Sequence, residues 1–138
     1  MRAGSLATLF SGTIAAAESA TASTAVADPV FASSVALQAV FAYGAGGTTA
    51  TYYVQTSVDA GTTWIDVATF AFATTALTKV VNLTSRTAVT TLYTPTDGSL
   101  ADNTVKDGIL GATWRVKRVT VGTYTGASTI AITAEWKR

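Results

Sequence analysis

The chain has 138 residues, of which 49% are hydrophobic and only 12% are charged, and its formal net charge is +1. It contains no cysteine and no histidine, which excludes disulfide bonds, Ser–His and Cys–His catalysis, and the commonest metal ligand. The length predicts one domain over residues 1–138, and no stretch approaches the roughly 18 uninterrupted apolar residues of a membrane helix.

The N-terminal segment, MRAGSLATLFSGTIAAAESATAS, has some features of a signal peptide, with an early arginine and a weakly apolar run. Ser11, Gly12 and Thr13 interrupt that run. We therefore expect the segment to belong to the fold, with an N-terminal arm over residues 1–12 and one or two strands before Pro29.

The rest of the chain alternates apolar and polar residues with a period of two, and no window sustains the 3.6-residue period of a helix. The fold class predicted is all-β: an antiparallel two-sheet sandwich, jelly-roll-like, with seven to nine strands. The strands expected after Pro29 are Ser34–Tyr43, Ala50–Val58, Thr63–Phe72, Ala76–Leu83, Arg86–Thr94, Ala112–Val121 and Ser128–Lys137.

The stretch SVDAGTTW follows the pattern S-x-D-x-G-x-T-W at Ser57, Asp59, Gly61 and Trp64. Over these eight residues it resembles the Asp-box hairpin of sialidase-like propellers, in which the acid and the glycine shape a turn and the aromatic packs beneath it. Asp59 can accept backbone N–H groups, and Gly61 permits positive φ. A glycosidase would need a second carboxyl held opposite Asp59, and nothing fixes Asp66 there, so we expect a structural turn and no catalytic residue.

The strand Thr63–Phe72 carries apolar side chains on both of its faces, unless a bulge shifts the phase. Burial of both faces in a small antiparallel domain implies that something covers the second face, and another subunit would do so. The interface candidates are Ile65, Val67, Phe70, Phe72 and Trp114.

A long loop, Thr94–Gly111, holds one proline, three glycines and three acids. It is either a functional excursion or a crossover between sheets, with one helical turn near Leu100–Val105. Its oxygen-bearing side chains do not follow the spacing of a calcium loop, so we expect neither a metal nor a cofactor. These side chains are Asp97, Asp102, Asn103 and Asp107.

Basic residues gather toward the C-terminus, yet aromatics do not alternate with them as stacking platforms would require. The sequence favours a mixed-charge surface over a nucleic-acid site. The residues concerned are Arg115, Lys117, Arg118, Lys137 and Arg138. Trp114 with Tyr124 could instead form a sugar platform, which leaves a carbohydrate- or receptor-binding module as the alternative function.

The neutral Thr- and Ala-rich strands, the missing His and Cys, the S-x-D-x-G-x-T-W hairpin and the D-G-I-L-G loop before a final strand pair resemble small all-β virion proteins of tailed bacteriophages. The resemblance covers about Gly12 to Lys137. It implies a non-enzymatic capsid decoration (cement) or head–tail accessory protein, found in the virion and in the host cytoplasm during assembly. Its partners would be copies of itself and major capsid or tail proteins, with no membrane and no nucleic acid.

Overall fold

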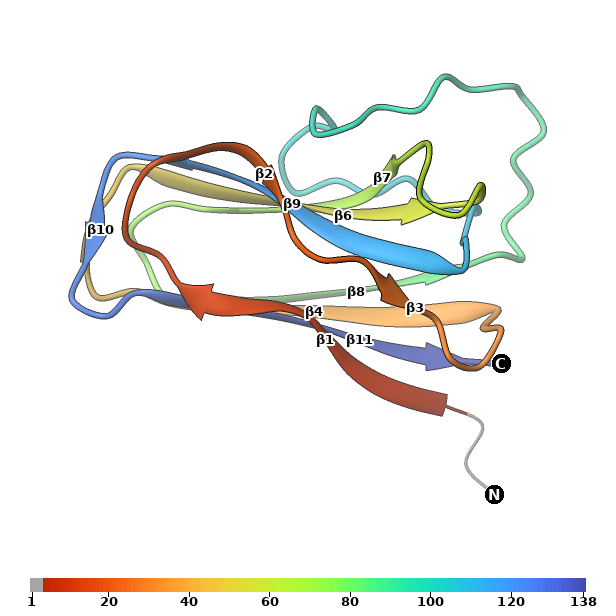
Figure 1. The fold of residues 1–138 in the computed structure, drawn as a ribbon, viewed down its shortest axis with the longest axis horizontal. Helices are drawn as coiled ribbons and strands as arrows, with labels where there is room; N and C mark the ends of the chain where they lie inside the picture. Colours follow the sequence, from red (N-terminus) through yellow and green to blue (C-terminus); the bar gives the residue numbers. More distant parts are fainter. Residues whose placement is uncertain (1–3) are drawn as a thin grey trace.

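The computed structural model describes residues 4–138, which form an all-β antiparallel fold in two layers (Figure 1). The four strands of the first layer, sheet A, lie in the order β1 (Gly4–Thr13), β11 (Thr129–Lys137), β4 (Ser34–Ala42) and β8 (Leu77–Thr84). Sheet B has the order β2 (Glu18–Ala22), β9 (Thr113–Val121), β6 (Thr49–Ser57) and β7 (Ile65–Phe72), and β3 (Val26–Ala27) also pairs with β9. A small sheet joins β5 (Ala45–Gly46) to β10 (Tyr124–Thr125). Between residues 4 and 138 no helix is long and apolar enough to cross a membrane.

The all-β antiparallel prediction is confirmed, although the described residues form eleven strands where seven to nine were predicted. The excess comes from β3, β5 and β10, which have two residues each. The segment Arg86–Thr94 is not a strand, and no helical turn forms at Leu100–Val105. Arg86–Thr94 alternates in sequence, but it runs outside the two sheets and pairs with no strand.

The N-terminal segment is part of sheet A from Gly4 onward, whereas we expected an arm over residues 1–12; residues 1–3 lie outside the described part of the chain. Strand β1 pairs with β11 over its whole length, from Gly4 opposite Lys137 to Thr13 opposite Thr129. The segment joins the sheet because its apolar side chains reach the core: Leu9 is buried, and Ala7 and Phe10 pack against the core.

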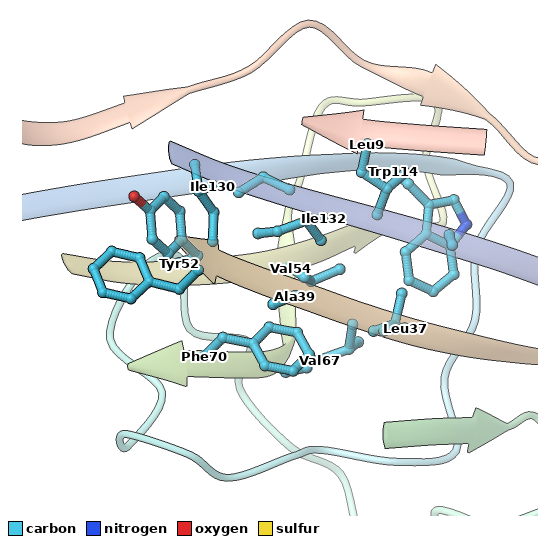
Figure 2. Packing of buried hydrophobic residues seen from close by; sticks show 14 of the residues in the cluster. Leu9, Leu37, Ala39, Tyr52, Val54, Val67, Phe70, Trp114, Ile130 and Ile132 are labelled. Atoms are coloured by element: carbon cyan, nitrogen blue, oxygen red, sulfur yellow. The ribbon is translucent and has the colours of Figure 1, made fainter. Parts of the chain in front are cut away.

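The hydrophobic core lies between sheets A and B, where alternate residues of β4, β6, β9 and β11 meet (Figure 2). Aromatic rings dominate it: Phe41 stacks on Phe72 with ring centroids 4.9 Å apart, and Trp114 meets Trp136 edge-on at 6.3 Å. Offset and edge-to-face pairs of this kind add stabilisation beyond the area that they bury. The predicted period-two pattern therefore identifies the core face of these strands correctly.

Strand β7 contains a bulge that changes which of its side chains face the core. Val54 pairs with Ala68 but the next residue, Gln55, pairs with Asp66, so Val67 has no partner on β6. An extra residue shifts the alternation by one. Val67 and Phe70 consequently belong to the same core cluster, and Figure 2 shows both directed toward sheet A.

Candidate functional site

The chain's own loop, residues 94–107, lies along the edge of β7 that does not pair with β6, and it buries the outward side chains Asp66 and Thr69. Backbone hydrogen bonds from Asp66 N to Thr96 O, from Thr69 N to Thr104 O and from Lys106 N to Val67 O run along the free edge of the strand. Asn103 adds a side-chain acceptor for Ala71 N. The loop thus occupies the position in which we expected a second subunit.

Asp66 anchors this loop from inside the protein. Its carboxylate is fully buried and accepts hydrogen bonds from Thr96 Oγ1 and from the backbone N–H groups of Gly98, Ser99 and Leu100. Gln55 Nε2 donates a further bond of 2.8 Å. A buried carboxylate is tolerated only when its oxygens are satisfied in this way. These hydrogen bonds assign Asp66 the role of holding the loop in place.

A polar network continues from Asp66 across the outer face of sheet B. Gln55 also donates to Asp97, and it accepts from Arg115 Nε at 2.7 Å. Asp97 forms ion pairs with Arg115 and with Lys117, at 3.3 and 3.0 Å. Burial raises the pKa of Asp97, but hydrogen bonds from Gln55 and Lys117 together with the two cations outweigh it, so the pKa lies below its ordinary value. The two carboxylates and the two cations of the network balance each other in charge, which is consistent with a structural role.

The other C-terminal bases are occupied too. Arg118 Nε pairs with Glu18 at 2.6 Å, Lys137 with Glu135 at 3.5 Å, and Arg138 Nε donates to Val30 O. Phosphate recognition needs cations that are available to the ligand. Each of these bases therefore lies beside an oxygen atom of this chain.

The segment Ser57–Trp64 forms a tight turn between β6 and β7. Ser57 Oγ accepts the N–H of Gly61 at 2.8 Å, and Asp59 Oδ1 accepts the N–H of Thr63 at 2.7 Å. The bond from Thr63 and that from the Ser57 hydroxyl lower the pKa of Asp59 to about 2. Gly61 has φ +91°. The Asp59 carboxylate therefore accepts its hydrogen bonds from residues of the turn itself.

Trp64 lies beside Gly61 of the turn, as we expected, but it is half-buried where we expected a buried ring. Ile65 takes the core position opposite Thr56, so Trp64 falls on the outer side of sheet B. There the Arg115 guanidinium lies 4.3 Å from the centroid of its ring. A cation over an aromatic face is favourable, and this contact ties the turn to the polar network.

The acids and the amide that we considered as calcium ligands are dispersed among separate partners. Asp107 binds Thr84 N and Thr87 Oγ1, and Asn103 binds Lys79 Nζ. Burial raises the pKa of Asp107, while bonds from Thr84, Thr87 and Gly108 lower it further than burial raises it. Within residues 4–138 no three His, Cys, Asp or Glu side chains gather as a metal site would require.

The predicted interface residues are all interior in this chain. Because of the bulge, the apolar residues of β7 enter one core, and Trp114 lies on the core face of β9. Every one is at most 4% exposed: Ile65, Val67, Phe70, Phe72 and Trp114. We correct the interface assignment accordingly. Tyr124 is buried as well, which also removes the proposed sugar platform of Trp114 and Tyr124.

Within residues 4–138 the outer face of sheet A is an uncovered and nearly uncharged surface, which sequence reasoning did not identify. Strand pairing aligns its side chains in rows, such as Leu6–Glu135–Ala36–Asn82 and Thr8–Thr133–Gln38–Val80. Among these rows only Glu135 is charged, and Leu6 and Val80 are 63% and 69% exposed. An open groove of about 640 Å³ crosses them. The missed signal was the small neutral residues that alternate with the core residues of β4.

One loop at the end of the sandwich also presents an aromatic side chain. Phe31 is 90% exposed and has φ +50°, a backbone conformation that a bulky residue adopts at a cost. Asp28 holds the loop by accepting the N–H groups of Val30 and Ala32 at 2.9 and 2.8 Å. The surrounding hydrogen bonds therefore fix Phe31 in an outward position.

Comparison with known proteins adds no relative: the chain matches no family model, no curated protein and no solved structure.

Proposed function

We propose that this chain is a non-enzymatic structural protein of a bacteriophage particle, a capsid decoration or head–tail accessory protein that docks through the outer face of sheet A. The observation that carries the proposal is the contrast between the two sheets. The chain's own loop and a neutralised ionic network cover much of the outer face of sheet B. The outer face of sheet A has no such covering segment among residues 4–138 and is nearly free of charge.

This arrangement supports docking to a protein surface. A soluble domain normally carries about 25% charged residues, and this one carries 12%. The deficit matters most on a flat sheet face, where few charges keep other sheets away. A shell or tail protein that covers this face would remove Leu6 and Val80 from water, and the small side chains between them allow close approach. A hydrolytic function has no support, since the carboxylates of Asp59 and Asp66 both accept hydrogen bonds from the backbone of loops.

The test uses particles of a bacteriophage whose genome encodes the chain. We expect the protein in purified virions by mass spectrometry, and we expect purified protein to bind particles made without it. Val80→Lys should lower this binding at least about tenfold, because a charge would be buried in the contact. Val121→Lys is the matched control, since Val121 is 50% exposed on sheet B. Absence from virions, or equal loss of binding in both variants, would overturn the proposal.

A further inference from the structure

Sheets A and B have four edge strands, and three of these edges are protected against pairing with another chain. Strand β7 has its edge occupied by the loop, as described above. Strand β8 is one edge of sheet A. There Thr84 N donates to the Asp107 carboxylate, and Lys79 Nζ donates to Ala71 O at 2.6 Å. A lysine and a covering loop are standard protections against pairing with another chain.

The remaining edge of sheet B is protected by its shortness. Strand β2 has a register shift between Glu18 and Thr21, and the edge is then interrupted before the two-residue strand β3. Glu18 adds a charge that pairs with Arg118. Short, irregular and charged edges make poor templates for an incoming strand.

Strand β1 has none of these protections except a bulge. Its ten residues, GSLATLFSGT, include no charged residue and no proline. It is the terminal strand of sheet A, and within the described chain no strand pairs with its outer edge. The register shift between Thr8 and Phe10 leaves Gly4–Thr8 as an uninterrupted stretch. The central residue of that stretch is Leu6, whose side chain is 63% exposed.

We propose that β1 pairs with β1 of a second copy of this chain, antiparallel about a two-fold axis at Leu6. An edge of unpaired N–H and C=O groups is a template for another extended backbone. Antiparallel pairing about a two-fold axis is self-complementary, because each copy offers the same stretch in the reverse direction. Strand β1, Gly4–Thr13, contains no charged residue that would repel the same strand of the second copy.

The pairing also accounts for Leu6. Residues directly opposite in an antiparallel pair have Cβ atoms about 4.5–5.5 Å apart. At a two-fold axis Leu6 therefore faces Leu6 of the second copy, and the two side chains cover each other. The result is one continuous sheet of eight strands, four from each copy. This inference rests on the proposed function in that it names one partner of the assembling protein, and its test does not require a particle.

Single-cysteine variants test the contact, since the chain has no cysteine of its own. Under mild oxidation Leu6→Cys should form a disulfide-linked dimer, whereas Val80→Cys, on the same face and equally exposed, should remain uncrosslinked. In sedimentation the unmodified chain should be a dimer, and Leu6→Lys should raise its dissociation constant about tenfold or more by placing like charges opposite each other. Val80→Lys should leave dimerisation unchanged.

A chain that stays monomeric at about 1 mM, or a dimer that persists in Leu6→Lys and is lost in Val80→Lys, would overturn the pairing. Binding to particles would be unaffected by that outcome. Failure of the two proposals is therefore distinguishable. Circular dichroism establishes that each variant is folded before it is compared.

Discussion

The side-chain amide of Gln55 donates to the Asp66 carboxylate over 2.8 Å, although neither residue is accessible to solvent. One comes from β6 and the other from β7, and they face each other because the bulge at Val67 brings them into register. This contact is the base on which the loop of residues 96–100 is held. It converts an acid that looked unremarkable in sequence into the anchor of the outer layer.

Asp66→Asn should detach this loop. The amide retains one acceptor oxygen but replaces the other with an N–H₂ group aimed at backbone donors, so we expect a loss of about 2–4 kcal/mol in the free energy of unfolding. Urea denaturation measures the loss, and limited proteolysis should show earlier cleavage within residues 94–107. Asp102→Asn is the control, because Asp102 is exposed, and it should change stability by less than about 0.5 kcal/mol. Equal stability of the two variants would contradict the anchoring role.

Ile65→Asp and Phe70→Asp should both prevent folding. Each side chain is 4% exposed in the same core, and a carboxylate there would have no partner, at a cost above about 4 kcal/mol. Circular dichroism and thermal denaturation check the result. A folded Phe70→Asp protein with altered assembly would restore the view that one face of β7 is an interface.

Gly61→Val should weaken the turn between β6 and β7. A β-branched residue at φ +91° costs about 1 kcal/mol or more, and its Cβ would also lie against the Trp64 ring. Asp59→Ala should also destabilise the fold, since it removes the acceptor of Thr63 N. Chemical denaturation of both variants is the measurement. If stability were unchanged and a binding activity disappeared, the turn would be a site in its own right.

Stability should fall in acid partly through Asp59. Its pKa is about 2 in the folded protein against an ordinary value of 3.8, so its contribution is full above about pH 4 and is lost as the pH drops toward 2. The lowered pKa values of Asp97 and Asp107 act in the same direction. Urea midpoints measured from pH 5 to pH 2 should decline less steeply in Asp59→Asn than in the unmodified chain. Identical slopes would show that Asp59 is not linked to folding.

Phe31→Gly should preserve or raise stability. The ring is 90% exposed, so little burial is lost, and glycine removes the strain of φ +50°. We expect a change between zero and about 1 kcal/mol in favour of the variant. Phe72→Ala, a core truncation, should instead lose about 3–5 kcal/mol. Thermal unfolding compares them, and a marked loss in Phe31→Gly would mean that the ring supports its own loop.

The sequence pattern predicted the strands in which one face packs in the core and the other points outward. Strands β4, β6, β9 and β11 alternate regularly, and each of their predicted limits lies within one residue of the observed one. Arg86–Thr94 alternates too, but alternation does not reveal whether a neighbouring strand is present. The bulge at Val67 was equally hidden, because the extra residue is apolar like those beside it.

The outer face of sheet A was harder to predict than the core. Its rows of Ala, Thr, Gln and Val are unremarkable as residues, and they become a surface only when pairing aligns four strands. Asp66 gave no local signal, because an acid between two core residues of a strand normally points toward solvent, yet Asp66 is buried here. The identity of its hydrogen-bond partners depended on a loop about thirty residues away, whose path no local pattern specifies.

The pairing of β1 with β11 has a consequence for biosynthesis. During translation, residues 4–13 leave the ribosome long before residues 129–137 exist, so β1 has no strand to join until the distant one is made. Contacts between such remote segments slow folding, and an uncharged, unpaired strand is prone to association in the meantime. The nascent chain should therefore require protection by a chaperone or a fast C-terminal docking step, and folding should be completed only after translation of β11.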